Sequence, residues 1–327
     1  MNLDLNLVTD LMDFTPVGSF LDTGGGGAWL SYMLTHNMPK IVADLQRNLD
    51  EKSLALIDSL FQQTAILPKN WLGNYMVRRK YIDAFHRPEE LESQKIYKMN
   101  LPQYRTDFVL DEDERTCEAF TYHTGLKGKN DKIKQYISGK DFIDGGSYIG
   151  DTALVYLKYY APRCVYSFDI SERVRMRYEK VMHMNNISPD KYKFCPMGLS
   201  DHRHKILIDD LGSPSSSIAF RGTSEAQLTD LDSFVSANKL RVGFIKGDLE
   251  GAMVEALKGM TETIKMHRPV LSLSIYHSPQ EFFETKPLLD EITKDLSYKI
   301  SIEKYCPYAM WAAEISIFAY PKELDND

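Results

Sequence analysis

The sequence predicts an α/β fold in which a mostly parallel sheet follows a helical N-terminal region. From residue 140 onward, short apolar segments alternate with amphipathic ones, which is the pattern of strands joined by covering helices. Two segments near the end, 298–302 and 314–320, lie too close together for a helical crossover and should pair antiparallel. We therefore expect seven strands with one reversed. The other five are residues 141–144, 164–169, 192–197, 242–247 and 270–275.

The composition excludes several classes of protein. The chain has 327 residues, of which 43% are hydrophobic and 26% charged, as expected of a globular protein with a full core. It contains no run of about 18 apolar residues, so no membrane span is expected. The acidic N-terminus lacks the basic start of a signal peptide, which predicts a cytoplasmic protein. A net charge of −7 argues against a nucleic-acid partner and leaves a small molecule or a glycan as the expected ligand.

The chain divides into three regions. Residues 1–103 carry helical apolar spacing over 28–67 and predict a helical cap or an oligomerisation element, through which the protein could form a homo-oligomer. The four glycines at 24–27 have no strand before them, so we interpret them as a flexible surface connection. Residues 104–135 form a bridging segment, and residues 136–327 form the ligand-binding domain.

The most informative stretch is the turn between the first strand and its helix. Glycines there let the backbone pass close to a ligand and leave the first N–H groups of the helix pointing at it. The spacing Asp144-x-Gly146-x-x-x-Gly150 differs from the Gly-x-Gly-x-x-Gly of dinucleotide-binding turns. Carboxylates on both sides disfavour a pyrophosphate and favour the ammonium, sulfonium and ribose hydroxyls of S-adenosylmethionine. The expected contacts are Asp144, Gly145, Gly146, Ser147, Tyr148, Gly150 and Asp151.

Acidic and polar residues follow the other predicted strands. Asp169 comes 19 residues after Gly150, near the offset of about 20 at which an acid meets a ribose diol. The carboxyl ends of parallel strands meet at one edge of an open α/β sheet, and ligands bind there. The further residues that we place at this edge are Ile170, Ser200, Asp201, Asp248, Glu250 and His277.

These segments together resemble a known family. The strings FIDGGSYIGDTAL, VYSFDIS, GLSD, TDLDSF, FIKGDLEGAMVEALKG, LSLSIYH and WAAEISIFAY follow, in order, the pattern of the FkbM-like methyltransferases over residues 121–320. The resemblance implies a Rossmann-like class I methyltransferase fold. It also implies an S-adenosylmethionine-dependent enzyme of a kind that O-methylates sugar or polyketide hydroxyls.

Four positions depart from the family pattern. Asp169 stands where a glutamate is commoner, and the shorter acid still reaches a diol. Ser147 replaces an alanine, and Tyr148 replaces an asparagine, which changes one contact to the methyl donor. Gly247 replaces an apolar residue at the end of its strand, so it either loosens the strand or admits the ligand closer.

The mechanism expected from these residues is an in-line methyl transfer that needs alignment and removal of a hydroxyl proton. Residues 144–151, Asp169, Ile170, Ser200, Asp201 and Asp248 are assigned to the methyl donor. His277 is the leading proton acceptor, with Asp248 or Glu250 as its rival or its orienting partner.

Other interpretations stay open at this point. Asp248 and Glu250 could merely cap the following helix or hold a divalent metal, although no dense ligand cluster demands one. A nicotinamide-dependent oxidoreductase is the alternative enzyme class. A non-catalytic S-adenosylmethionine-binding partner of a glycan-assembly enzyme is the alternative outside catalysis.

Overall fold

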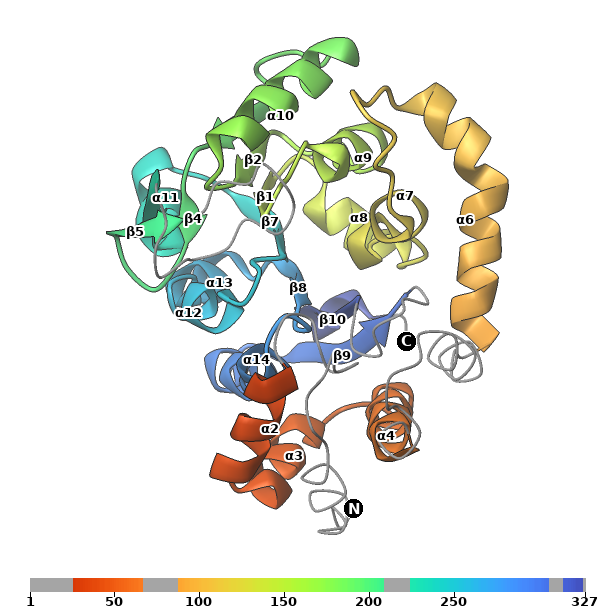
Figure 1. Ribbon diagram of the computed structural model, residues 1–327. Helices are drawn as coiled ribbons and strands as arrows, with labels where there is room; N and C mark the ends of the chain where they lie inside the picture. Colours follow the sequence, from red (N-terminus) through yellow and green to blue (C-terminus); the bar gives the residue numbers. More distant parts are fainter. Residues whose placement is uncertain (1–25, 67–87, 209–223, 306–313, 326–327) are drawn as a thin grey trace.

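The computed structural model describes residues 26–66, 88–208, 224–305 and 314–325, and its central feature is a sheet of seven strands (Figure 1). The strand order is β3-β2-β1-β7-β8-β10-β9. β10 runs antiparallel to both neighbours and the remaining pairs are parallel, which confirms the predicted mostly parallel sheet with one reversed strand. The strands are β1 (Asp141–Gly145), β2 (Val165–Phe168), β3 (Tyr192–Cys195), β7 (Val242–Gly247), β8 (Val270–Ser274), β9 (Tyr298–Lys304) and β10 (Ile315–Pro321).

Helices cover both faces of this sheet. Every residue of β1, β7, β8 and β10 is buried, as expected for strands with a helix layer on each side. One core contains Phe142 and Phe244 and is closed by α8 (Asp131–Ile137), α9 (Asp151–Tyr159) and α10 (Glu172–Met184). The other contains Ile143 and Ile245 and is closed by α11 (Leu231–Asn238), α12 (Met253–Lys258), α13 (Thr261–His267) and α14 (Pro279–Thr293).

The N-terminal helices pack on one side of the sheet. They are α2 (Gly26–Thr35), α3 (Met38–Gln46) and α4 (Glu51–Ile66). Trp29 of α2 contacts the rings of Phe282 and Phe283 on α14. Ser53 Oγ of α4 accepts a hydrogen bond from the N–H of Ile302, so this helix covers part of the edge strand β9. The predicted role of this region in oligomerisation stays a prediction.

One sequence interpretation is wrong in this region. The glycines at 26 and 27 form the first turn of α2, so these two do not belong to a surface connection. The glycines at 24 and 25 lie outside the described residues.

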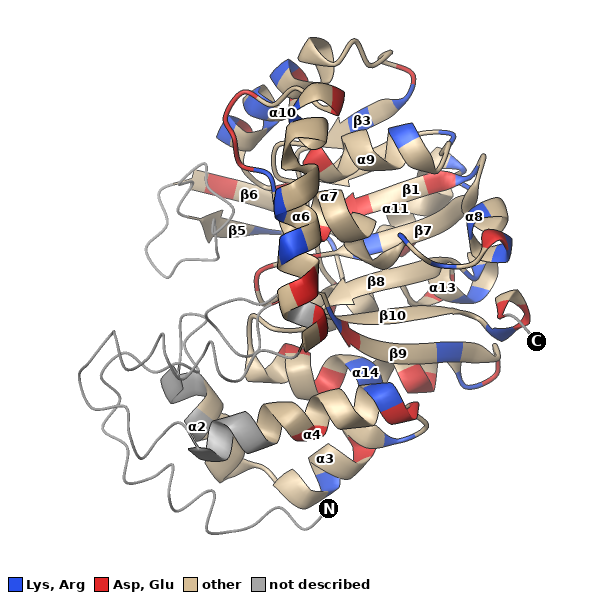
Figure 2. Ribbon diagram, turned by 90° about the vertical axis from the view of Figure 1, so that its right-hand side faces the viewer, with Lys and Arg blue, Asp and Glu red and all other residues tan. Residues whose placement is uncertain are grey.

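A long helix and a short one precede the sheet. α6 (Pro88–Asp107) runs crosswise to the strands (Figure 2) and continues past residue 103, where the sequence places the limit of the first region. The division into three regions stays a prediction. α7 (Cys117–Tyr122) and the 3-10 turn η2 (His123–Gly125) follow, and α7 packs against α9.

A small second sheet lies between β3 and β7 in the chain. Its strands β4 (Gly198–Leu199), β5 (His204–Ile208) and β6 (Ser224–Thr229) pair in the order β4-β6-β5. Residues 209–223, the tip of this insertion, lie outside the described residues. Among the helices that the structure describes, none is both long and apolar enough to cross a bilayer.

Candidate active site

A cavity of about 800 Å³ opens at the carboxyl ends of β1, β2 and β7. Of the residues assigned to the site from sequence, those that line it are Gly146, Tyr148, Asp151, Asp169, Ile170, Ser200, Asp248 and Glu250. Those that do not line it are Asp144, Gly145, Ser147, Gly150, Asp201 and His277. The acids around the cavity are Glu114, Glu118, Asp151, Asp169, Asp248, Glu250, Glu255 and Glu314, whereas Lys246 is the one lysine or arginine among the described residues that line it.

The glycine turn is shaped by close packing against the protein itself. Gly146 has φ +71°, and a Cβ there would lie 1.8 Å from the carbonyl oxygen of Asp248. Gly150 has φ +84° and caps α9, where a Cβ would lie 2.6 Å from Met182 and 2.7 Å from Tyr178. Both positions therefore require glycine even before a ligand is considered.

Asp144 organises the floor beneath the turn. Its side chain is fully buried, and Oδ2 accepts a hydrogen bond from Thr152 Oγ1 at 2.6 Å. The Nζ of Lys246 lies 3.5 Å from Asp144 Oδ1 and donates to the carbonyl oxygens of Gly145 and Gly146 at 3.2 and 2.7 Å. Although burial alone would lower the pKa of Lys246, the surrounding carboxylates raise it, so this lysine stays charged. Asp144 and Lys246 thus fix the turn from below.

Asp169 holds the next part of the cavity wall through backbone contacts. Its Oδ2 accepts from the N–H of Tyr148 at 3.2 Å and its Oδ1 from the N–H of Ser171 at 3.0 Å. Each oxygen can accept a further hydrogen bond, so the carboxylate is oriented yet still able to bind a diol. Ile170 and Ser200 line the cavity beside it.

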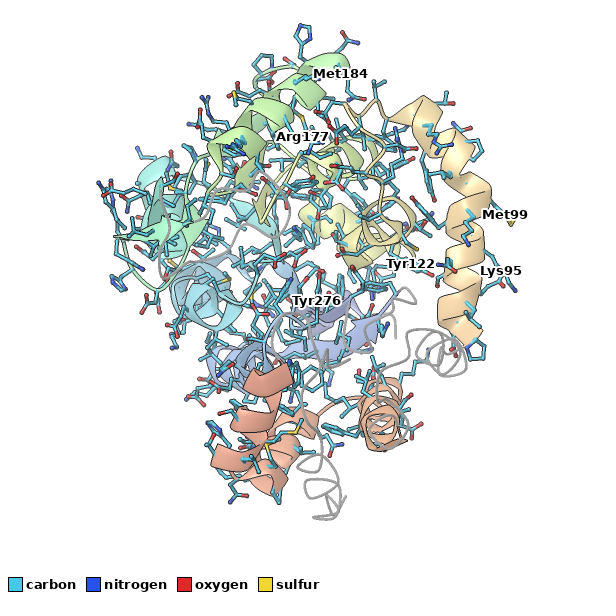
Figure 3. The ribbon with its side chains drawn as sticks, viewed as in Figure 1. Lys95, Met99, Tyr122, Arg177, Met184 and Tyr276 are labelled. Atoms are coloured by element: carbon cyan, nitrogen blue, oxygen red, sulfur yellow. The ribbon has the colours of Figure 1, made fainter. Side chains whose placement is uncertain are left out.

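Tyr148, the residue that departs from the family pattern, is anchored by an arginine on α10 (Figure 3). Arg177 Nη1 donates to the Tyr148 hydroxyl oxygen at 2.9 Å, and that hydroxyl donates to Glu114 Oε2 at 2.6 Å. Arg177 also makes two hydrogen bonds to Asp111, both of 3.0 Å. The Tyr148 ring is therefore held in place at the cavity wall by paired charges.

His277 lies among three carboxylates. Its Nε2 lies 3.2 Å from Asp248 Oδ1 and 3.6 Å from Glu250 Oε1, and its Nδ1 lies 3.1 Å from Glu281 Oε2. Although burial alone would lower the pKa of His277, its hydrogen bonds with Asp248 and Glu281 raise the pKa well above the usual value. The ring therefore carries a proton at neutral pH. A protonated imidazole can orient carboxylates, but it cannot accept a further proton.

The carboxylates after β7 do not act as helix caps. The first N–H groups at α12, those of Gly251 and Met253, donate to Glu281 Oε1 at 3.1 and 3.0 Å. Asp248 and Glu250 are thus left facing the cavity. Although burial would raise the pKa of Asp248, the hydrogen bond from His277 and the charge of Lys246 hold it well below the usual range. Asp248 therefore stays ionised.

Gly247 has a packing role. A Cβ there would lie 2.4 Å from Met253 Cε, and the residue does not line the cavity. It remains within the fully buried strand β7. The expectation that this glycine loosens the strand or admits the ligand closer is therefore wrong, because the space belongs to Met253.

The cavity-lining residues that sequence reasoning missed include Glu118, Tyr276 and Glu314. Tyr276 lies just beyond β8, near the middle of the molecule (Figure 3). Glu314 directly precedes β10, and because β10 is the reversed strand, its start lies at the edge where the parallel strands end. The predicted antiparallel direction of the last strand could therefore have placed Glu314 at this edge of the sheet. Glu118 has no comparable signal, since it comes from a helix outside the sheet.

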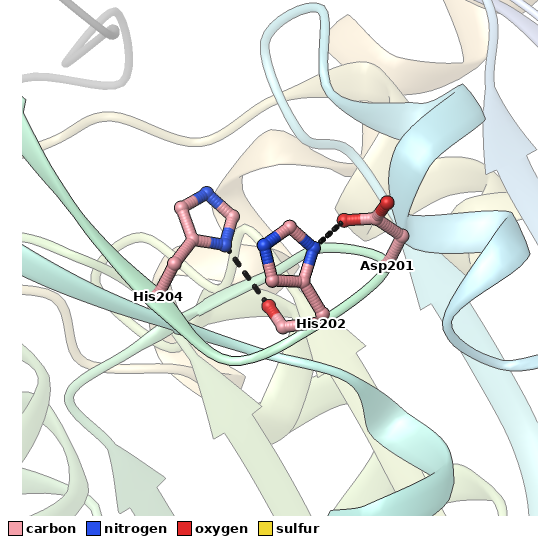
Figure 4. Close-up of side chains that lie close together, drawn as sticks. All are labelled: Asp201, His202 and His204. Carbon is pink, nitrogen blue, oxygen red and sulfur yellow. Dashed lines mark hydrogen bonds and ion pairs between the residues drawn. The ribbon is translucent and has the colours of Figure 1, made fainter.

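Asp201 does not line the cavity and lies beside two histidines, His202 and His204 (Figure 4), of which His204 does line it. His202 Nδ1 lies 2.6 Å from Asp201 Oδ1, and His204 Nδ1 lies 3.0 Å from the carbonyl oxygen of His202. Ligand atoms of the three side chains lie within 4.8 Å of one another, a grouping that the sequence analysis did not single out. The two rings are stacked with centroids 4.4 Å apart.

Comparison with known proteins gives the following. Residues 144–300 match the model of the methyltransferase FkbM domain. The crystal structure of methyltransferase FkbM from Methylobacillus flagellatus is similar with a TM-score of 0.56 and 15% sequence identity, over 90% of this chain and 61% of that one. This chain thus spans less than two thirds of that protein, and the likeness supports the fold alone. A Streptococcus mutans protein solved in complex with SAH has a TM-score of 0.34 and 13% identity, over 58% of this chain and 93% of that one, which is too low to carry an argument. No curated protein sequence matches the chain.

Proposed function

We propose that this protein transfers the methyl group of S-adenosylmethionine to a hydroxyl of a sugar, a glycan or a natural-product precursor, because residues 144–300 match the model of the methyltransferase FkbM domain. S-adenosylmethionine supplies an electrophilic methyl group on a positively charged sulfur. The chain's own residues must hold that cation, exclude competing ligands, and orient and deprotonate an acceptor hydroxyl.

The observation that carries the proposal is the charge of the cavity. Carboxylates from several segments line the cavity, and Lys246 is the one lysine among its described lining residues. Lys246 already donates hydrogen bonds to two carbonyl oxygens and lies beside Asp144. A pyrophosphate would find no free lysine or arginine among the described residues of the lining, whereas a sulfonium and an ammonium would each find carboxylates. This favours S-adenosylmethionine over a nicotinamide dinucleotide.

The expected donor contacts lie on the β1 and β2 side of the cavity. The turn at Gly146 and Tyr148 presents backbone to the ligand, Asp169 offers oriented oxygens for the ribose hydroxyls, and Ile170 and Ser200 border the same wall. Asp151, at the start of α9, lines the cavity beside the turn. Burial raises the pKa of Asp151 to about 6, so a nearby cation would favour its ionised form.

The reacting groups are expected on the β7 and β8 side. We assign Asp248 and Glu250 to the acceptor end of the cavity, where they can accept hydrogen bonds from acceptor hydroxyls. His277 is assigned as a positioning residue. It is hydrogen bonded to Glu281 and Asp248, and its raised pKa leaves it protonated.

The first experiment is calorimetry with S-adenosylmethionine and with NAD, side by side. We expect the former to bind and the latter to leave no measurable heat. Asp169→Ala should weaken donor binding by about 10- to 30-fold, because one charged hydrogen-bond acceptor is lost. Asp190→Ala, which removes an exposed acid, serves as the matched control and should bind like the wild type.

The second experiment identifies the acceptor. Labelled S-adenosylmethionine is incubated with the protein and a panel of sugar nucleotides and glycans, and label transfer is measured. Transfer to a hydroxyl supports the proposal. Binding of NAD in preference to the methyl donor would favour the oxidoreductase, and binding of the donor with transfer to no acceptor would favour the non-catalytic binding partner.

A further inference from the structure

Two glutamates that the proposed function leaves unassigned face each other in the cavity. Glu118 stands in the first turn of α7, and Glu314 directly precedes β10. Both line the cavity, and each carboxyl group lies close enough to the other to raise or lower its pKa. Two buried carboxylates that lie close together repel each other, which favours a state in which one of them is protonated. The pair is therefore suited to hold one proton and one negative charge.

The backbone at Glu314 is unusual. Its φ is +60°, in the left-handed region that disfavours a residue with a Cβ by roughly 1–2 kcal/mol. Apart from the proton that it can share with Glu118, the buried Oε2 of Glu314 meets no hydrogen-bond donor among the described residues. Glycine would fit this backbone at lower cost, so the position keeps a carboxyl group aimed into the cavity despite the strain.

The charged groups around the pair come from several strands. On β7 and directly after it lie Lys246 and Asp248, after β8 lies His277, and on β9 lies Lys304. Burial and the charge of Asp248 raise the pKa of Glu314 to about 7, while Lys304 and His277 oppose the rise. Burial and the charges of Glu314 and Asp248 raise the pKa of Glu118 well above the usual range. Such a pair exchanges a proton near neutral pH.

Neighbouring groups are less suited to taking a proton. His277 already carries one, and Asp248 is so strongly stabilised as an anion that it is a weak base. A general base acts best when its pKa lies near the working pH. The two glutamates are therefore better suited to this step than His277 or Asp248.

We propose that Glu118 and Glu314 form the proton-accepting pair for the hydroxyl that is methylated. This inference rests on the proposed function. The acceptor oxygen bonds to the methyl carbon as the carbon–sulfur bond breaks, and the electron pair of the broken bond stays on sulfur. The hydroxyl proton passes to the ionised carboxylate of the pair, which becomes neutral as the sulfonium loses its charge. The pair later releases this proton to solvent through the open cavity.

The deciding experiment needs no acceptor. S-adenosylmethionine and S-adenosylhomocysteine are titrated by calorimetry at pH 7 in two buffers of different ionisation enthalpy, which gives the protons released on binding. Only the former carries the sulfonium charge. A cation near the pair lowers its pKa, so the sulfonium ligand should release more protons than the neutral one.

The proteins compared are the wild type, Glu118→Gln, Glu314→Gln and the control Glu262→Gln, an exposed acid on α13. In the wild type and the control we expect S-adenosylmethionine to release more protons than S-adenosylhomocysteine. In each pair variant this difference should be at most half as large, while the affinity for S-adenosylmethionine stays within about threefold of the wild type. An unchanged excess in both pair variants, or no excess in the wild type, overturns the inference while the proposed function stands. Failure of the wild type to bind S-adenosylmethionine defeats the proposed function, and the inference with it.

A kinetic readout separates catalysis from structure. With an acceptor from the labelled panel, kcat of the wild type should rise with pH through about 7, whereas Glu314→Gln should lose this rise and about 100-fold in kcat. KM for the donor should change little. The role would pass to Glu250 if Glu250→Gln lost about as much kcat as Glu314→Gln and if both pair variants kept the wild-type rise of kcat with pH.

Discussion

The two ends of the cavity treat their carboxylates in opposite ways. At the β1 and β2 end, Asp169 accepts two backbone N–H groups, and Glu114 is paired with Arg177. At the β7 and β10 end, Glu118 and Glu314 both line the cavity, burial raises the pKa of each, and we propose that they share a proton. Hydrogen bonds from backbone N–H groups and from Arg177 orient the Asp169 and Glu114 carboxylates of the first end for holding a ligand, whereas the two glutamates of the second end have pKa values that make their charge depend on pH. The same residue type thus serves binding at one end and proton exchange at the other.

The largest expected effect tests the β1 and β2 end. Gly146→Ala would place a Cβ 1.8 Å from the Asp248 carbonyl oxygen, so it should lower the free energy of unfolding by about 3 kcal/mol and abolish donor binding. Urea denaturation and calorimetry measure the two effects.

Gly139→Ala is the matched control, because Gly139 also has a positive φ, +69°, but has open space where its Cβ would lie. It should cost about 1 kcal/mol and leave binding intact. Equal effects of both substitutions would show that the close approach of the two loops is unimportant.

The acidic end depends on the proton held by His277. His277→Ala leaves Asp248, Glu250 and Glu281 without their shared cation and should lower the free energy of unfolding by about 3 kcal/mol. Turnover should collapse while the surviving folded protein binds the donor nearly as well as the wild type. Unchanged turnover would remove His277 from the mechanism, and a large loss of donor affinity would show that the two ends are not separable.

Stability against pH sharpens the contrast further. Glu314 has an ordinary pKa of 4.5 and one of about 7 in the folded protein. Between these values the folded state binds a proton that the unfolded state has lost, so the free energy of unfolding falls as pH rises from about 5 to about 8. Glu314→Gln should remove roughly 2 kcal/mol of this fall. Urea denaturation at several pH values gives the free energy of unfolding of both proteins. If the two free energies change in parallel from about pH 5 to about pH 8, the shared proton is contradicted.

The smallest expected effect concerns the wall at Tyr148. Arg177→Gln removes the hydrogen bond to the Tyr148 hydroxyl and the ion pairs of Arg177 with Asp111 and Glu114, so it should lower donor affinity a few-fold and the free energy of unfolding by about 1 kcal/mol. Arg175→Gln on the same helix removes a partly exposed arginine that pairs only with Glu172 and Glu179 among the described residues. It should change stability by less than about 0.5 kcal/mol. Equal losses of donor affinity and of stability in both variants would show that the hydrogen bond from Arg177 to Tyr148 contributes nothing.

The difference between the two ends also explains what the sequence could predict. Strand order, the reversed β10 and the place of Asp169 follow from local patterns, because alternation, glycine turns and strand ends are visible in short windows. Asp144 was correctly placed at the turn, but its burial beneath Lys246 depends on β7, a hundred residues later. Its exclusion from the cavity could not be read from the turn alone.

The acidic end is assembled from distant segments, which is why sequence reasoning reached it only in part. Asp248 and His277 follow predicted strands and were found. Glu118 comes from α7, and its meeting with Glu314 exists only in the folded chain. The protonation of His277 likewise depends on Glu281, in the first turn of α14, whose contact with the ring no strand pattern indicates.

A crystal structure of the protein with S-adenosylmethionine tests the central claim most directly. We predict the donor in the acid-lined cavity, with its ribose hydroxyls within hydrogen-bond distance of Asp169 and its sulfonium directed toward the end that holds Glu118 and Glu314. An empty cavity at saturating donor, or a donor bound with Asp169 turned away from its ribose, would contradict the account.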